Sequence, residues 1–214
     1  WSKALQASGG LVLIISLLAL GLPGNSPKIE KSSEPEAESE LTLLKTINGA
    51  MSHSGYLLLN VGFFVCGFHV AFIGTHLPSF LQSEGISIST ASWALAMIGL
   101  FNMFGSMIFG RMGDSLSKKN LLSLLYTLRA VVIAGFLAIP LNEITAIAFG
   151  AAIGFLWLAT VPLTSGIVAQ VFGTRYLSTL WAIVFFSHQL GAFLGVWLGS
   201  HQLSNYSHLV EIEE

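Results

Sequence analysis

Six apolar runs of membrane-spanning length are the feature that most limits what this chain can fold into. Only one of the runs contains a charged side chain, Arg129. About 20 predominantly apolar residues in a helix cross a hydrocarbon core of about 30 Å. Charged residues make up 9% of the chain, where a soluble domain has about 25%. The sequence therefore predicts an all-α integral membrane protein with six transmembrane helices, at residues 4–22, 55–75, 92–109, 121–139, 144–171 and 177–198.

The first run has one alternative interpretation, a secretory signal, because Lys3 precedes it and Pro23–Gly24 follow it. The run is long for a signal core, and no small-residue cleavage site stands out. We therefore expect residues 1–22 to form a transmembrane helix.

Polar segments divide the rest of the chain. Residues 23–52 are rich in Pro, Gly, Ser, Lys and Glu and have too few apolar side chains to bury a core. They are predicted to form a flexible linker, with a short amphipathic helix at residues 41–47 as the alternative. Residues 53–200 hold the other five helices, and 201–214 form a polar tail. Pro78 and the polar residues 82–85 are expected to end the second helix.

The basic residues predict the orientation, because cytoplasmic connections of membrane proteins are enriched in Lys and Arg. The connections after the second and fourth helices, and the tail after the sixth, contain neither. Linker 23–52 and connection 110–119 are therefore predicted to be cytoplasmic, in a multi-pass protein of the plasma (cell inner) membrane. Seven of the nine basic residues fall on that side: Lys28, Lys31, Lys45, Arg111, Lys118, Lys119 and Arg175.

Connection 110–119 also carries a family pattern. It resembles the signature loop of the major facilitator superfamily (MFS), Gly-x-Leu-x-Asp-Arg-x-Gly-Arg-Arg/Lys. The family's Arg and later Gly are replaced here by Ser115 and Ser117. The resemblance implies a gate in which the Asp faces a helix N-terminus of the other half and the basic residues tune that contact. The alternative is a charged loop that only sets topology. The residues concerned are Gly110, Arg111, Gly113, Asp114, Lys118 and Lys119.

The resemblance extends over most of the chain, from the first helix to about Gly199. A helix, a polar linker and five further helices are similar to helices six to eleven of a twelve-helix MFS transporter. Residues 1–22 would then be the last helix of the N-terminal half, and the other five helices of that half and the twelfth helix would be missing. Segments 67–69, 172–176 and 188–195 resemble the branch that contains monocarboxylate porters and oxalate–formate antiporters.

Arg129 is the most informative single residue. Counted from Asn120 at about 1.5 Å per residue, it lies roughly 14 Å deep, near the bilayer midplane. A charge there is costly, so it should face a cavity or a partner. It is predicted to anchor a substrate carboxylate, because a guanidinium can hold one with two hydrogen bonds. The alternative is a structural pair with a carboxylate or with carbonyls of another helix.

Other polar residues inside the helices are weaker candidates for binding the solute. His69 and His188 can bind a substrate oxygen or relay a proton near neutral pH, which would couple transport to protons; simple packing is the alternative. Gln189 and Asn60 are predicted solute contacts, with interhelical hydrogen bonding, also expected for Asn102, as the alternative. The histidines are too dispersed for a metal site.

Small residues and one proline predict how the helices pack and bend. Pro162 removes a backbone hydrogen bond and is expected to make a hinge in the fifth helix, where Thr160, Thr164 and Ser165 also lie. Glycines four residues apart are expected to bring helix backbones close together. These glycines are Gly150 with Gly154, and Gly191, Gly195 and Gly199.

These features predict a secondary transporter that moves a small solute, an organic anion such as a monocarboxylate, by alternating access. Export of an apolar solute, an inactive fragment and a non-transporting membrane subunit are the alternatives. No nucleophile–base pair, phosphate-binding loop or paired cysteines occur, so no enzyme and no cofactor are expected. The near-neutral net charge of −2 implies no nucleic-acid partner.

Overall fold

Long apolar runs become long helices here because a backbone in lipid must satisfy its polar groups internally. The computed structural model describes the backbone of residues 36–213 and the side chains of residues 42–201. The predicted helix 4–22 and linker residues 23–35 lie outside these ranges. The described helices are α2 (Glu36–Ser52), α3 (Ser54–Ser83), α4 (Ile88–Ser115), α5 (Lys118–Ala138), α6 (Glu143–Leu156), α7 (Thr160–Phe172) and α8 (Leu177–Glu213).

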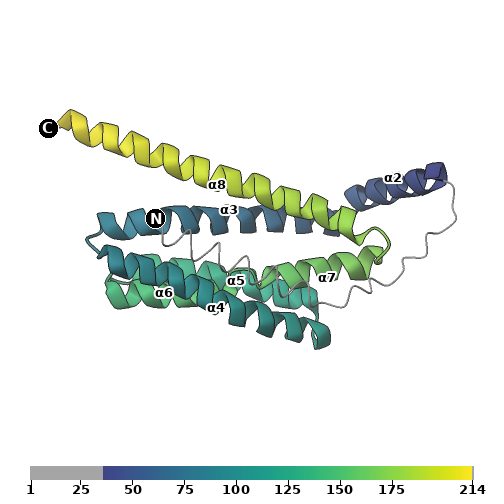
Figure 1. The fold of residues 1–214 in the computed structure, drawn as a ribbon, viewed down its shortest axis with the longest axis horizontal. Helices are drawn as coiled ribbons and strands as arrows, with labels where there is room; N and C mark the ends of the chain where they lie inside the picture. Colours follow the sequence, from purple (N-terminus) through teal and green to yellow (C-terminus); the bar gives the residue numbers. More distant parts are fainter. Residues whose placement is uncertain (1–35, 214) are drawn as a thin grey trace, which may run out of the picture. The chain divides into compact units, whose positions relative to one another are not determined.

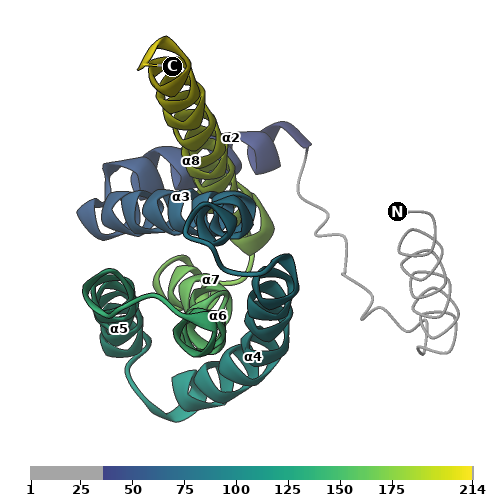
Figure 2. The ribbon, with the colours of Figure 1, turned by 90° about the vertical axis from the view of Figure 1, so that its left-hand side faces the viewer.

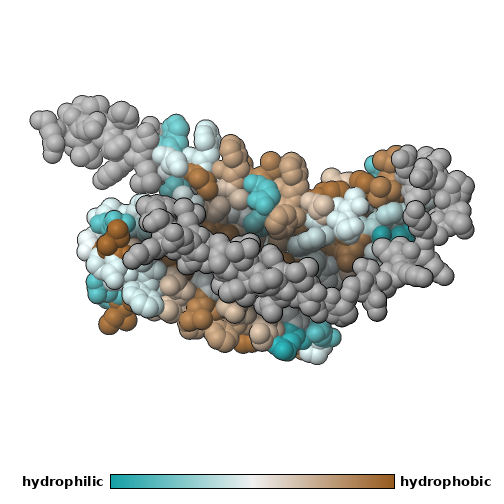
Figure 3. Space-filling model, in the orientation of Figure 1, coloured by the Kyte–Doolittle hydropathy of each residue, from teal (hydrophilic) through white to brown (hydrophobic). Residues whose placement is uncertain are grey.

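Five candidate membrane spans occur among the described residues. They are α3, α4, α5, the combined segment Glu143–Phe172 and the part of α8 up to His201. They correspond to the second to sixth predicted helices, so the all-α membrane fold is confirmed for the described part of the chain. Figure 3 shows hydrophobic side chains over the middle of the helices and hydrophilic ones mostly toward their ends.

Several predicted boundaries were wrong. Residues 36–52, expected to belong to a flexible linker, form α2, and its Ala50 is fully buried against a hydrophobic cluster with Tyr56 and Val184. Pro78 does not end the second helix, because membrane helices tolerate an interior proline. The helix ends at Ser83, within the predicted polar residues 82–85, and Gly85 takes a left-handed φ of 82° there.

The charged connection and the tail are also more helical than expected. Of residues 110–119, only Leu116 and Ser117 are outside a helix, because α4 continues through Ser115 and α5 begins at Lys118. Charged residues do not break a helix, and Lys118 Nζ donates to the Gly113 carbonyl at the end of α4, 2.6 Å away. α8 runs to Glu213 through most of the predicted tail, which contains neither Pro nor Gly after Gly199.

Glycines bring two helix pairs into close contact, as the sequence predicted. A Cβ atom at Gly191 would overlap the carbonyl of Phe64, so α3 and α8 touch backbone to backbone. A Cβ atom at Gly150 would overlap the carbonyl of Ala94, and the same holds for α4 and α6. In lipid such close approach supplies the van der Waals contact that drives helix association. Figure 2 shows α3 crossing α8, while α4, α5, α6 and α7 pack beside one another.

The short links between the long helices lie at two opposite ends. The α4–α5 and α7–α8 links lie at one end, and the α3–α4 and α5–α6 links lie at the other (Figure 1). Lys119, near the start of α5, and Phe172, at the end of α7, line the same groove with His53. The α5–α6 link ends in a capping box between Asn142 and Thr145. The basic residues at 111, 118, 119 and 175 therefore share one end of the helices.

Candidate functional site

The fifth predicted span is interrupted in its middle. α6 ends at Leu156, α7 begins at Thr160, and residues 157–159 between them are not helical. Pro162, the third residue of α7, has no N–H to donate to the Leu158 carbonyl, which instead accepts from Val161 N–H at 3.0 Å. The interruption therefore lies just before Pro162, and it leaves backbone groups of residues 156–158 free to bond elsewhere.

Arg129 takes up two of these free groups. It projects from α5, is only 2% exposed, and donates through Nη2 to the carbonyls of Leu156 (2.6 Å) and Trp157 (2.8 Å). Its Nη1 donates to the Cys66 sulfur on α3, 3.2 Å away. Its Nε is buried and has no hydrogen-bond partner in the described part of the chain. The guanidinium thus joins α3 and α5 to the interruption, and none of its three hydrogen-bond acceptors is a carboxylate.

Asn102 holds the interruption from the other side. Its Oδ1, on α4, accepts from the Leu158 N–H at 3.0 Å and from the Ser106 hydroxyl at 3.4 Å. Interhelical hydrogen bonding by Asn102 was the favoured prediction, and the structure shows it. Two helices thus supply side chains to three consecutive residues, 156–158, whose backbone would otherwise be buried without partners.

Cys66 is a member of the cluster that sequence reasoning did not assign. It is fully buried, and its sulfur lies 3.5 Å from the Thr160 hydroxyl at the start of α7. Tyr126, one turn before Arg129, lies with its ring 5.5 Å from the guanidinium and donates to the Gly62 carbonyl at 2.8 Å. The only sequence signal was the spacing of Cys66, which places it near the face of α3 that carries His69.

The predicted histidines lie at different distances from this cluster. His188 is buried on α8 with its ring against those of Phe63 and Phe185, and its backbone carbonyl packs against Gly67, the residue after Cys66. Its Nδ1 has no partner among the described residues. His69 lies one turn beyond Cys66 on α3, and its Nδ1 is likewise buried and unpartnered within the described chain. The structure therefore gathers Arg129 and both histidines into one region.

The other predicted residues lie apart from the cluster. Asn60 donates to the Tyr56 carbonyl at 2.9 Å, within its own helix. Gln189, the residue after buried His188 on α8, is exposed. His76 approaches the Val196 carbonyl at 3.3 Å near the other end of α8.

Residues 110–119, which resemble the family signature loop and are called the signature segment below, pack against α7. This contact lies at the end of the helices that carries Arg111, Lys118, Lys119 and Arg175, called the basic end below. A Cβ atom at Gly113 would come within 2.6 Å of Leu163, and one at Gly166 within 2.6 Å of the Lys118 side chain. Gly110 lies beside Pro162. Asp114 is exposed and has no hydrogen bond or ion pair with any described residue. Arg111 and Lys119 are exposed as well, so a gate contact by these charges stays a prediction.

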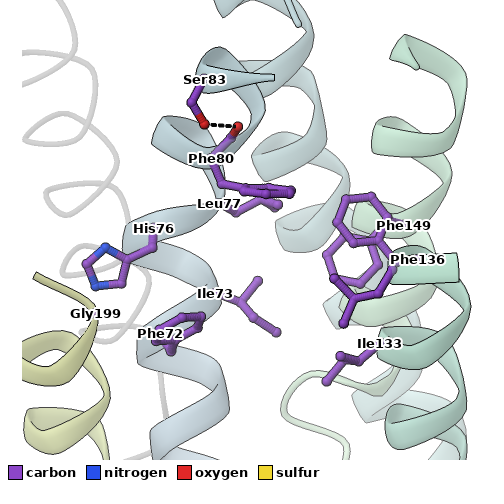
Figure 4. A pocket seen from close by; sticks show the side chains of 11 residues that line it. Phe72, Ile73, His76, Leu77, Phe80, Ser83, Ile133, Phe136, Phe149 and Gly199 are labelled. Atoms are coloured by element: carbon purple, nitrogen blue, oxygen red, sulfur yellow. Dashed lines mark hydrogen bonds between the residues drawn. The ribbon is translucent and has the colours of Figure 1, made fainter. Parts of the chain in front are cut away.

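Two grooves flank the contact between α3 and α5. The groove at the basic end has a volume of about 620 Å³ and is lined by Tyr56, Lys119 and Tyr126, among others. The groove at the other end has a volume of about 470 Å³ and is almost wholly apolar. Figure 4 shows Ile73 and Leu77 of α3 on one side of it and Phe136 and Phe149 on the other, while His76 points away toward Gly199.

No group of three or more His, Cys, Asp or Glu side chains that could hold a metal ion occurs among the described residues.

Comparison with known proteins is consistent with this architecture. A family model described as "Major Facilitator Superfamily" matches residues 1–196. The uncharacterized MFS-type transporter YcxA of Bacillus subtilis is 26% identical over 147 residues, which cover 66% of this chain and 36% of that protein. The uncharacterized MFS-type transporter YhjX of Escherichia coli is 22% identical over 188 residues, which cover 86% of this chain and 45% of that protein.

A mammalian protein also matches. Monocarboxylate transporter 12 of Mus musculus is 25% identical over 144 residues, which cover 65% of this chain and 29% of that protein. The matched part of the chain thus spans less than half the length of each of these relatives.

Proposed function

The chain belongs to the major facilitator superfamily, and from that membership we propose that the protein moves a small organic anion, such as a monocarboxylate, across the membrane by alternating access. The described helices would form one of two bundles that rock about a site near the bilayer midplane. The other bundle, an N-terminal half, would complete the pathway. We place the basic ends of the helices, with the signature segment, in the cytoplasm of a plasma-membrane protein.

The proposal depends chiefly on the charge of Arg129. It is the one charged side chain that is buried among the described residues. Its hydrogen-bond partners are two backbone carbonyls and the Cys66 sulfur, and none of them is a carboxylate. A buried charge without a counter-charge is costly, and an anionic solute would supply that counter-charge. The unpartnered Nε–H gives such a solute a donor.

Two further observations support an anion of small size. Unpartnered Nδ1 atoms of His69 and His188 lie in the same region as Arg129, where they could bind a solute oxygen or carry a proton that moves with it. One relative is named for the transport of monocarboxylates, which are anions that a guanidinium binds well.

The test is uptake by the intact protein in proteoliposomes. We expect Arg129→Ala to abolish uptake or exchange of monocarboxylates while the amount of protein inserted in the membrane stays the same. Gln82→Ala is a control, because Gln82 is an exposed polar residue at the end of α3 whose side chain donates to the Pro78 carbonyl in its own helix. Normal transport by Arg129→Ala would remove Arg129 from the binding site.

Export of an apolar solute is the second candidate, and the apolar groove of about 470 Å³ between α3 and α5 favours it. In that case Arg129 would serve only to hold the interruption between α6 and α7. Transport that does not depend on the charge of the solute would support this alternative. Transport that requires a carboxylate would exclude it.

A further inference from the structure

Arg129 cannot keep its three present hydrogen bonds and also bind a carboxylate through both of the carboxylate's oxygens. A guanidinium carries five N–H donors: one on Nε, two on Nη1 and two on Nη2. In the described structure the carbonyls of Leu156 and Trp157 occupy Nη2, and the Cys66 sulfur occupies one donor of Nη1. The donors that remain are Nε–H and one N–H of Nη1.

A carboxylate cannot bind those remaining donors with both oxygens. Two-oxygen binding uses one edge of the planar guanidinium, either Nε with Nη2 or Nη1 with Nη2. Both edges include Nη2, which already serves the two backbone carbonyls. A solute carboxylate that binds Arg129 in this way must therefore displace at least one of them.

The displaced backbone has another set of partners available. In an uninterrupted helix the Leu156 carbonyl accepts from the N–H of residue 160, and the Trp157 carbonyl from that of residue 161. The Leu158 N–H, which now donates to Asn102, would donate to the Gly154 carbonyl. Only the Leu158 carbonyl would lose its backbone donor, because Val161 N–H would move to Trp157 and Pro162 has no N–H to replace it, so the helix would keep a kink there. Loss of the Arg129 bonds therefore shifts the balance toward helix at residues 157–159.

We propose that solute binding and the α6–α7 interruption compete for Arg129, so that an anion on its guanidinium converts the interrupted segment 157–159 into continuous helix. This inference rests on the proposed function, because it takes Arg129 to be the anion site. It adds a means by which binding reaches the backbone of α6 and α7. Asn102 stabilises the interrupted state and so opposes binding.

The test is whether replacing Asn102 lowers or raises the half-saturating lactate concentration. The apparent affinity for a ligand is the intrinsic affinity multiplied by the fraction of protein in the binding-competent state. Asn102→Leu removes the acceptor that holds Leu158 in the interrupted state, so the half-saturating lactate concentration should fall by about two- to tenfold, the equivalent of one hydrogen bond. Ser106→Ala removes only the longer bond to Asn102 and should leave that concentration unchanged. If Asn102 merely positioned Arg129 for the solute, Asn102→Leu would instead raise it.

A second measurement avoids dependence on one variant. Hydrogen exchange of the wild-type protein in proteoliposomes should slow at the amides of residues 157–161 when lactate is added, because helix formation protects them. The uncharged lactamide should have no effect, and a peptide from within α6 should respond to neither compound. Exchange that is unchanged or faster at 157–161 while lactate is bound would overturn the inference.

The uptake assay separates the two proposals. If lactate, formate and oxalate are not transported, or if Arg129→Ala transports them normally, the proposed function fails and the inference fails with it. If transport requires Arg129 but Asn102→Leu does not tighten lactate binding, the inference alone is wrong and the anion site stands.

Discussion

At the scale of single residues, the centre of the described bundle is a small polar cluster enclosed by apolar side chains. Arg129, Cys66 and Asn102 come from three different helices, and each bonds to a residue outside its own helix. A buried polar group without a partner is expensive, so every member of such a cluster depends on the others. A substitution here should therefore destabilise the protein mainly by leaving the hydrogen-bond partner of the replaced side chain buried and unsatisfied.

Cys66 offers the clearest prediction at this scale. Cys66→Val keeps the size of the side chain but leaves the Nη1 donor of Arg129 buried without an acceptor, which should destabilise the protein by about 1–3 kcal/mol. Cys66→Ser keeps an acceptor and should lose much less. Thermal unfolding of the detergent-solubilised protein measures both. Equal loss in the two variants would mean that the bond from Arg129 contributes little.

At the scale of helices, close approach of backbones organises the described bundle. α3 packs on α8 and α4 packs on α6 through glycines that leave no room for a side chain. Because lipid offers little apolar driving force, packing of this kind carries much of the association energy. The interruption between α6 and α7 is the exception to regular helix, and polar side chains from α4 and α5 stabilise it.

Glycine substitutions test the packing directly. Gly191→Ala would force its Cβ into the Phe64 carbonyl and push α8 away from α3, so we expect a loss of about 1–3 kcal/mol or more. Gly135→Ala is the matched control, because nothing lies within 4 Å of its Cβ position inside α5. The control should be neutral or stabilising by up to about 1 kcal/mol, since Ala favours helix over Gly. Thermal unfolding compares the pair, and equal effects would contradict the argument.

Pro162 tests whether the interruption is used as a hinge. Pro162→Ala restores an N–H that can bond to the Leu158 carbonyl, so it should favour continuous helix through residues 157–172. We expect the maximal transport rate to fall by about tenfold, because a stiffened segment slows the conformational step. The half-saturating solute concentration should not rise. An unchanged maximal rate in transport assays would show that α6 and α7 need not bend there.

At the scale of the whole molecule, the charge distribution predicts how the protein sits in the membrane. The α4–α5 and α7–α8 links, which have Arg111, Lys118, Lys119 and Arg175 in or beside them, lie at one end of the helices. The α3–α4 and α5–α6 links, which carry no Lys or Arg, lie at the other. Retention of Lys and Arg on the cytoplasmic side gives this arrangement one preferred orientation.

Cysteine labelling in intact cells tests that orientation. In a Cys66→Ser background, Leu116→Cys should react with a membrane-impermeant maleimide only after the membrane is opened. Gln82→Cys and Asn142→Cys should react in intact cells. All three positions lie at helix ends, so exposure to water is comparable and sidedness decides the result. Reaction of Leu116→Cys in intact cells would invert the proposed topology.

Much of the fold was readable from the sequence because lipid imposes simple requirements. A run of apolar residues must become a helix long enough to cross the bilayer, and basic links must stay on one side. The five described spans, the close glycine contacts and the break near Pro162 were all predicted on such grounds. The errors fell at helix ends, where charged or polar residues at 36–52 and 110–115 form helix although they cannot lie in lipid.

The partners of the polar residues were decided by the tertiary structure alone. The sequence identified Arg129 as buried and costly, but spacing along one helix cannot tell which distant backbone groups will reach it. Those groups are the carbonyls of Leu156 and Trp157, which are free because the helix is interrupted in front of Pro162. Hydropathy and charge act locally along the chain, whereas a hydrogen bond between helices depends on how glycine contacts and crossing angles bring them together. That is why the spans followed from the sequence and the cluster around Arg129 did not.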